Sequence, residues 1–335
     1  MKEKILEMLL ASPGKPISGE EISRLLGISR TAIWKHIQAL RAEGYEIESR
    51  TRQGYRLLQQ PDLLTGQSIW PYLIADLRER IKIFHFHQLD STNIYARKLA
   101  TAGAPEGTVV IAESQWAGKG RKGRSWQSAS GKGMWLTLVL RPPILPRQTT
   151  LLPLLTAVAV VEAVEKTVPG AACGIKWPND VLAQNRKLAG ILTEMSAELD
   201  MVNFVLVGVG VNLNQDEEDF APDLLGTAIS LKQLAGDKVN RGQFTAAFIN
   251  AFWKLYERYL QEGAQAVLGP WRQKALVLGK EVIIHEYTGD WAGMALDIDE
   301  EGALLVRDEQ QQIRRVLAGD VTLRLGEGQK NDTGF

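Results

Sequence analysis

The sequence is poor in the residues that form covalent and metal crosslinks. It holds a single cysteine, Cys173, among 335 residues, which excludes an intrachain disulfide and a zinc site built from cysteines. The longest apolar run, residues 151–161, is interrupted by Pro153 and Thr156 and is too short to cross a bilayer. The first residues are charged and then follow a helical pattern, unlike a signal peptide. We therefore expect a cytoplasmic protein that does not enter a membrane.

The chain also lacks net charge. Its 39 Lys and Arg balance 39 Asp and Glu, so no overall field directs the protein to nucleic acid or to a membrane. The balance is uneven, because residues 1–60 contain ten Lys or Arg, seven Glu and no Asp, which gives +3 there and −3 in the remainder. A hydrophobic content of 45% over this length is enough for two or three domains with proper cores.

The N-terminal segment shows the signals of consecutive short helices. Ser18 and Glu21 form a possible capping box for one helix, and Gly27 is placed to end it. Ser29 can cap the next helix, which we expect over residues 30–43. With a further helix expected over residues 3–11, these signals predict a helix-turn-helix.

A pair of strands follows and predicts a wing. Residues 45–57 have the pattern of two short strands that turn near Gln53 and Gly54. Added to a helix-turn-helix from Gly19 to Gln38, this predicts a winged helix that contacts DNA. The candidate DNA-binding residues are Ser29, Arg30, Thr31, Trp34, Lys35, Gln38, Arg50 and Arg52. The alternative is a helical module that contacts only proteins. Trp34 could also be a surface aromatic or a core residue.

The rest of the chain divides by pattern. A polar stretch around Pro61 indicates a linker, and strands mixed with helices follow it. From about residue 278 the pattern changes to short strands, which predict a β-barrel of SH3-like size. We expect an α+β multidomain fold: a winged helix-turn-helix domain (1–62), an α/β domain with a mixed sheet (63–274), an SH3-like domain (275–328) and a disordered tail (329–335).

The stretch ESQWAGKGRKGRSW, residues 113–126, is the leading candidate for a ligand site. Three glycines at 118, 120 and 123 alternate with four cations at 119, 121, 122 and 124. Glycines let backbone N–H groups surround an anion, and Lys and Arg add positive charge. We expect this loop to be mobile without a ligand and to bind a phosphate-bearing molecule.

Two other interpretations of the loop are weaker. Its glycines match G-x-G-x-x-G, but strands at 108–112 and 134–140 flank it, whereas a dinucleotide fingerprint opens a helix. The chain has no G-x-x-x-x-G-K-[ST] motif of a P-loop. A solvated basic hairpin without a ligand is the remaining alternative.

Polar groups elsewhere could serve the same ligand. Ser91, Thr92 and Asn93 begin a predicted helix, where they could cap it or grip a polar ligand. Lys176 ends an apolar strand beside Trp177, where its ammonium requires an anionic partner.

In combination, these segments resemble the family of bifunctional biotin–protein ligases and biotin-operon repressors. The matching motifs, in the family's order, are SRTAIWKHI, DSTN, ESQWAGKGRKGRSW, KWPNDV, RKLAGIL, GVGVNLN and AGDVTLR. The resemblance implies that biotin and Mg·ATP give biotinyl-5′-adenylate and pyrophosphate, and that biotin then passes to a lysine of a biotin carboxyl carrier domain. It also implies that the adenylate promotes a homodimer that binds operator DNA and represses biotin genes.

The resemblance assigns roles by position. The implied catalytic residues are Lys176 and Arg121. The implied biotin-binding residues are Ser91, Thr92, Asn93, Gln115, Lys119, Gly120, Arg121 and Lys176. The implied ATP or adenylate residues are Gly118, Arg121, Arg124, Trp126, Asn179, Asp180, Asn212 and Arg324. No protein ligand is assigned to Mg²⁺. Lys119 stands where the family often has arginine, which keeps the charge without the planar guanidinium.

Two alternatives remain at this point. A lipoate–protein ligase uses the same general chemistry, although KWPND and the winged helix disfavour it. A biotin-responsive transcription factor without ligase turnover would retain the same motifs.

Overall fold

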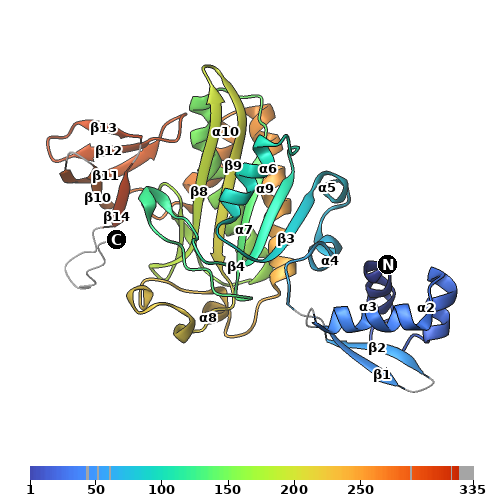
Figure 1. The fold of residues 1–335 in the computed structure, drawn as a ribbon. Helices are drawn as coiled ribbons and strands as arrows, with labels where there is room; N and C mark the ends of the chain where they lie inside the picture. The colour runs from blue at the N-terminus through green and yellow to red at the C-terminus, as the bar shows by residue number, and fades with distance from the viewer. Residues whose placement is uncertain (43–44, 51–52, 60–61, 287–288, 318, 324–335) are drawn as a thin grey trace. The chain divides into compact units, whose positions relative to one another are not determined.

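The computed structural model describes residues 1–42, 45–50, 53–59, 62–286, 289–317 and 319–323. The chain separates into two compact units, Met1–Asp62 and Leu63–Phe335. The first unit contains α1 (Lys2–Ala11), α2 (Gly19–Leu26), α3 (Arg30–Ala42), β1 (Glu46–Arg50) and β2 (Gly54–Gln59) (Figure 1).

The predicted helix signals of this first unit are confirmed. The hydroxyl of Ser18 accepts a hydrogen bond from Glu21 N at 3.0 Å, and Gly27 ends α2 with a φ of 65°. Ser29 Oγ accepts from Ala32 N at 3.2 Å and so caps α3. The apolar side of α3 is fully buried, and β1 pairs with β2 in an antiparallel wing. The winged helix-turn-helix is therefore present.

The second unit is built on a mixed sheet with strand order β3-β4-β5-β9-β8-β7-β6, in which only β3 and β4 run parallel among the described strands. Its strands are β3 (Lys82–Leu89), β4 (Thr108–Gln115), β5 (Gly133–Leu140), β6 (Gly174–Lys176), β7 (Asp180–Ala183), β8 (Arg186–Glu198) and β9 (Met201–Asn212). Its helices are α4 (Gly66–Ile69), η1 (Trp70–Tyr72), α5 (Ala75–Arg80), α6 (Thr92–Thr101), η2 (Arg121–Gly123), η3 (Pro146–Thr150), α7 (Leu151–Thr167), η4 (Glu217–Asp219), η5 (Pro222–Leu224), α8 (Leu231–Ala235), α9 (Arg241–Glu262) and α10 (Gln265–Lys274).

Helices cover the two faces of this sheet unequally. Helices α7, α9 and α10 lie behind it in Figure 1 and share the large core, whereas α6 lies in front over a smaller cluster. The stretch Pro146–Thr167 is the one described helix long and apolar enough to span a bilayer, and it is mostly buried in this core. Helix α10 was not predicted, because Gly269 and Pro270 inside it are helix-breaking signals.

The C-terminal strands form an antiparallel sheet in the order β13-β12-β11-β10-β14. They are β10 (Glu281–Glu286), β11 (Gly289–Ile298), β12 (Leu304–Asp308), β13 (Ile313–Val316) and β14 (Asp320–Leu323). Apolar residues of this sheet belong to the same core cluster as α7 and the central sheet. Trp177 Nε1 donates to Gly302 O at 2.9 Å, which joins the two sheets in front of α7. The predicted α+β architecture is confirmed.

A buried ionic network lies beside the start of this unit. The carboxylate of Glu113 on β4 accepts from Arg241 at 2.9 Å, from His85 at 2.8 Å and from the backbone N–H of Leu64 at 2.8 Å. Arg241 is fully buried and also donates to Gly133 O at 3.0 Å. Burial alone raises the pKa of Glu113, but the hydrogen bond with His85 and the charge of Arg241 outweigh it and hold that pKa below its usual value.

Candidate ligand site on the central sheet

The floor of the candidate site lies on the α6 face of the central sheet, where glycines replace larger side chains. Along β9, Phe204 and Leu206 pack toward α6, and the next two positions on that face are Gly208 and Gly210. Gly210 pairs with Gly190 of β8. The missing side chains help to leave an open cavity on this face of the sheet.

The cavity brings together segments that are distant in sequence. Its lining comes from the start of α6, the end of β4, the basic loop, strands β5 and β7 to β9, and the first residue of β14. The lining residues are Ser91, Thr92, Asn93, Gln115, Lys119, Gly120, Arg121, Arg124, Ser125, Trp126, Leu136, Asn179, Asp180, Lys187, Gly190, Ile191, Leu192, Gly208, Val209, Gly210 and Asp320.

Trp126 rests directly on the glycines of the floor. A Cβ atom at Gly210 would lie 2.5 Å from the Trp126 ring, and one at Gly190 would lie 2.7 Å from it. Trp135 packs edge-on against the ring, with centroids 6.2 Å apart. The indole N–H of Trp126 is buried without a hydrogen-bond partner in the described part of the chain. A flat aromatic wall of this kind suits a planar heterocycle as a ligand.

Gly210→Ala is expected to lower kcat/KM by about 10- to 100-fold for the biotin–protein ligase reaction that the sequence resemblance implies, because the new methyl group displaces Trp126 from the floor. The measurement is the rate of pyrophosphate release, with the near-ultraviolet circular dichroism of tryptophan as a structural readout. Gly269→Ala is the matched control, since a Cβ there meets no atom within 4 Å. Unchanged kinetics for Gly210→Ala would remove Trp126 from the site.

A neutral hydrogen-bonding network forms one end of the cavity. Gln115 Oε1 accepts from Thr92 N at 2.8 Å and lies 3.2 Å from Thr92 Oγ1, while Gln115 Nε2 donates to Ser128 Oγ at 2.8 Å. Ser91 is the N-cap of α6 by position, but its hydroxyl makes no capping hydrogen bond. Helix capping therefore does not account for Ser91, which lines the cavity instead.

The basic loop forms another part of the lining as a compact hairpin. Gly120 N donates to Arg124 O at 2.7 Å, and Trp126 N donates to Gly118 O at 2.9 Å. Gly118 itself does not line the cavity; a Cβ there would lie 2.4 Å from Trp126 O. Arg121 donates to Asn179 Oδ1 at 2.9 Å, which ties the loop to the segment between β6 and β7.

Asp320, the first residue of β14, anchors the loop from the C-terminal sheet. Its carboxylate lies 2.6 Å from Arg124, 3.4 Å from Lys122 and 3.7 Å from Arg121. Burial raises the pKa of Asp320, but these three cations outweigh it and hold the pKa below its usual value. The loop expected to be mobile is thus held in place by an anionic side chain that the sequence analysis did not identify.

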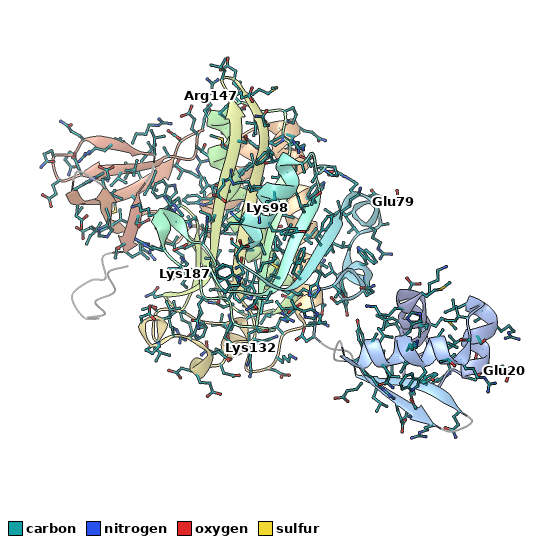
Figure 2. The ribbon with its side chains drawn as sticks, viewed as in Figure 1. Glu20, Glu79, Lys98, Lys132, Arg147 and Lys187 are labelled. Carbon is teal, nitrogen blue, oxygen red and sulfur yellow. The ribbon has the colours of Figure 1, made fainter. Side chains whose placement is uncertain are left out.

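The two lysines near the site differ in position. Lys187 lines the cavity at the lower end of β8 in Figure 2, with Nζ 2.9 Å from Asp180 Oδ1 and 5.4 Å from the Trp126 ring centroid. Lys176 does not line the cavity and pairs with Asp180 across the β6–β7 ladder. Burial is the main cause that lowers the pKa of Lys176. Lys187 and Arg124 lower this pKa further, against a partial offset by Asp180.

The remaining predicted site residues fall into three groups. Asn179 and Asp180 line the cavity, and Asn179 Nδ2 also donates to Ile191 O at 2.8 Å. Asn212 lies outside the lining, and its Nδ2 donates to Lys187 O at 3.3 Å, which fixes the backbone of the lining lysine. Arg324 lies outside the described residues. Lining residues that the sequence analysis did not name for the site include Ser125, Leu136, Lys187, Gly190, Ile191, Leu192, Val209 and Asp320.

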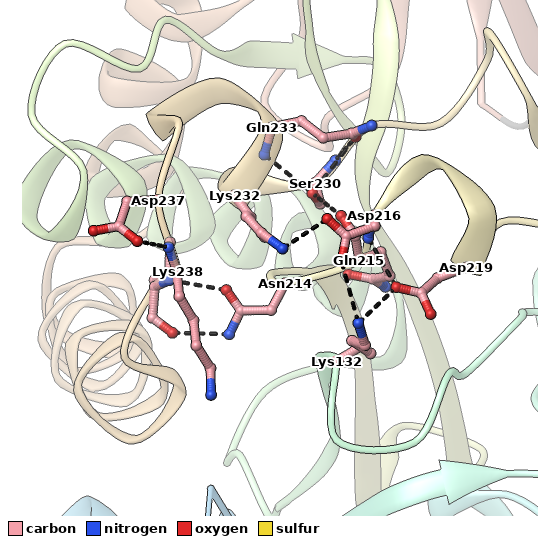
Figure 3. Close-up of polar contacts among 11 residues, drawn as sticks. Lys132, Asn214, Gln215, Asp216, Asp219, Ser230, Lys232, Gln233, Asp237 and Lys238 are labelled. Atoms are coloured by element: carbon pink, nitrogen blue, oxygen red, sulfur yellow. Dashed lines mark hydrogen bonds and ion pairs between the residues drawn. The ribbon is translucent and has the colours of Figure 1, made fainter.

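The segment after β9 is held by a cluster of ion pairs that reaches the neighbour of Trp126. Lys132 bridges Asp219 at 2.8 Å and Asp216 at 3.4 Å, and Lys232 meets Asp216 at 2.6 Å (Figure 3). Gln127, the neighbour of Trp126, donates to Asp219 O at 3.0 Å. This polar cluster therefore holds the segment beside the tryptophan wall.

In the N-terminal unit, the predicted DNA face is open to solvent. Ser29, Arg30, Thr31, Trp34 and Lys35 are exposed, whereas Gln38 is half-buried. Because the Trp34 side chain is 53% exposed, it is not the core residue of the alternative interpretation. On the wing, Arg50 pairs with Glu48 at 2.9 Å, and Arg52 lies outside the described residues.

Comparison with known proteins agrees with this arrangement. Residues 85–212 match the Biotin/lipoate A/B protein ligase family, residues 2–56 match an HTH domain and residues 277–324 match the Biotin protein ligase C terminal domain. The bifunctional ligase/repressor BirA of Bacillus subtilis is 41% identical over 96% of this chain and 98% of its own length. The Escherichia coli BirA is 30% identical over 95% of this chain and 96% of its own length.

A solved structure shows the same fold. The biotin protein ligase of Aquifex aeolicus, in complex with biotin and ATP, superposes with a TM-score of 0.63 at 27% identity. The match covers 72% of this chain and 98% of the Aquifex chain. With a full-length relative above 40% identity and all three family segments in order, the chain belongs to the family of bifunctional biotin ligase/repressor proteins.

Proposed function

We propose that the protein forms biotinyl-5′-adenylate from biotin and ATP and then transfers biotin to a lysine of a biotin carboxyl carrier domain. One observation supports this most strongly: a single cavity is lined both by a neutral hydrogen-bonding network and by cationic side chains. Thr92 and Gln115 suit the uncharged polar ring of biotin, whereas Arg121, Arg124 and Lys187 suit phosphates. A site that bound only one of the two substrates would not need both the neutral network and the cations.

The charges address the main obstacle to adenylate formation. The carboxylate of biotin must approach the α-phosphate of ATP, and the two anions repel each other. Lys187 between Asp180 and the Trp126 ring is placed to neutralise both, with Arg121 and Arg124 on the phosphates. No side-chain nucleophile is required, because the adenylate itself is the activated acyl group.

We assign the other positions by the same geometry. The biotin-binding part consists of Ser91, Thr92, Asn93, Gln115, Lys119 and Gly120, and the adenylate-binding part of Arg121, Arg124, Trp126, Asn179, Asp180 and Lys187. Gly118, outside the lining, and Arg324, outside the described residues, are proposed for the adenylate on the sequence resemblance alone. Lys176 and Asn212 act behind Asp180 and Lys187 rather than on the ligand. Mg²⁺ bound to the phosphates of ATP would supply further charge neutralisation.

The C-terminal sheet contributes by covering the cationic end. Asp320 reaches the loop from β14, and the shared core fixes that strand beside the cavity. Exclusion of water would protect the mixed anhydride until the carrier lysine arrives. We therefore propose three domains, with the winged helix at 1–62, the catalytic domain at 63–274 and the C-terminal domain at 275–328.

For the winged helix we propose repression of biotin genes. A single winged helix reads one half-site, so a palindromic operator requires two copies of the chain. We propose that biotinyl-5′-adenylate promotes this homodimer in the cytoplasm. A rise in molecular mass on addition of biotin and ATP, measured by light scattering, would support the dimer. An operator affinity that is the same with and without biotin would contradict this proposal.

Lys35→Met is expected to weaken operator binding about equally for all sequences and to reduce the salt dependence by about one phosphate contact. The reason is that Lys35 is exposed on α3, where we expect its charge to contact a phosphate. Fluorescence anisotropy at several salt concentrations measures this slope. Lys4→Met on α1 is the control, and an equal loss there would argue against α3 as the DNA-contacting helix.

The enzyme activity is tested with labelled biotin, ATP and a purified carrier domain. Label on the carrier lysine supports the ligase. Transfer of lipoate in preference to biotin would identify a lipoate ligase, and biotin binding without transfer would identify a transcription factor without turnover.

A further inference from the structure

Behind the biotin end of the cavity, a chain of hydrogen bonds leads from a charged pair to Thr92. Glu194 on β8 accepts from Asn93 Nδ2 at 2.8 Å through one oxygen and pairs with Arg97 at 3.1 Å through the other. Asn93 Oδ1 lies 2.6 Å from Thr137 Oγ1, which in turn lies 2.9 Å from Thr92 Oγ1. Asn93, Thr137 and Thr92 are all buried.

The direction of every bond in this chain follows from Glu194. A carboxylate only accepts, so Asn93 must turn its NH₂ group toward Glu194 and its oxygen toward Thr137. Thr137 therefore gives its single proton to Asn93 and has only lone pairs to offer Thr92. The Thr92 proton is then directed at Thr137 or at Gln115, 3.2 Å away. Only lone pairs of Thr92 Oγ1 remain for a ligand.

We propose that Glu194 is a positioning residue that sets the Thr92 hydroxyl as an acceptor for an N–H group of the bound ligand. Under the proposed function, on which this inference rests, that group is a urea N–H of biotin. Neither Glu194 nor Thr137 lines the cavity, so both act through their neighbours. Gly208 permits the arrangement, because a Cβ there would lie 2.1 Å from Asn93 Oδ1.

Arg97 makes the proposal testable, because it only donates. In Glu194→Gln the new amide must turn its oxygen to Arg97 and its NH₂ to Asn93, which reverses Asn93 and the hydroxyls behind it. Thr92 then receives a proton and loses acceptor capacity. In the double variant Glu194→Gln, Arg97→Met, the new amide no longer has to turn its oxygen to Arg97. It can turn that oxygen to Asn93, which restores the wild-type bond directions, and ligand binding selects this orientation.

The experiment is isothermal titration of biotin into the full chain and its variants, without ATP. We expect Glu194→Gln to weaken binding by about 10- to 100-fold, Arg97→Met to change it by less than about threefold and the double variant to regain most of the loss. In steady state, the KM for biotin should rise in Glu194→Gln while the KM for ATP and kcat at saturating biotin stay within about twofold.

Each outcome decides a separate point. Failure of the wild-type chain to bind biotin overturns the proposed function. Wild-type binding with an equal affinity in Glu194→Gln overturns the positioning role. A double variant as weak as Glu194→Gln, or a melting temperature that falls together with the affinity, shows that Glu194 supports only the local structure.

Discussion

Lys187→Met is expected to slow biotinyl-adenylate formation by about 100- to 1,000-fold while the protein remains folded. Its ammonium is the lining cation that lies closest to both Asp180 and the tryptophan wall. Methionine keeps most of the side-chain volume and removes the charge that offsets the repulsion between carboxylate and phosphate. Single-turnover pyrophosphate release at saturating biotin and ATP measures the chemical step.

Two other lysines serve as comparisons. Lys176→Met should slow the reaction by about tenfold, because Lys176 is outside the lining of the cavity but pairs with Asp180 in the β6–β7 ladder and lies within the field of Lys187 and Arg124. Lys82→Met, exposed on the edge strand β3, should leave the rate unchanged. If Lys176→Met slowed adenylate formation strongly and Lys187→Met slowed it only slightly, the roles assigned to the two lysines would be reversed.

Arg241→Met is expected to lower the free energy of unfolding by about 3–5 kcal/mol, because it leaves the Glu113 carboxylate buried without its cation. Denaturant unfolding of the full chain, followed by tryptophan fluorescence, measures the change. Arg258→Met breaks an exposed pair with Glu262 on α9 and should cause no measurable change. Equal stabilities of the two variants would show that the buried network contributes little.

The same network predicts how stability depends on pH. The folded-state pKa of Glu113 lies below its unfolded value, so this carboxylate contributes stability that is complete above the unfolded pKa, about 4.3. That contribution is lost as the pH falls from there through the folded-state pKa. The acid limb of the stability curve should therefore flatten in Glu113→Gln.

Local sequence signals predicted much of this fold. Capping and apolar spacing located the helices of the winged unit, as the Ser18 cap and the αL conformation of Gly27 show. The loop at residues 113–126 was predicted to lie between two strands, and β4 and β5 pair on either side of it. These features depend on neighbours in sequence, which a single chain displays directly.

The features that were missed depend on contacts between distant segments. Asp320 is a single carboxylate on a short strand, and its role follows only from the packing of the C-terminal sheet beside the loop. Lys176 and Lys187 both adjoin apolar strands, so sequence alone does not tell which one faces the ligand. The β7–β8 ladder, with its irregular register near Val181, places Lys187 in the lining. Trp126 needs two glycines from separate strands, Gly190 and Gly210, to reach the floor.

Native mass spectrometry of the purified chain after incubation with biotin and Mg·ATP, without a carrier domain, tests the central claim most directly. The account predicts one biotinyl-5′-adenylate retained per chain, with release of one equivalent of pyrophosphate. Folded wild-type protein that holds biotin and ATP side by side without joining them, or that binds neither, would contradict it.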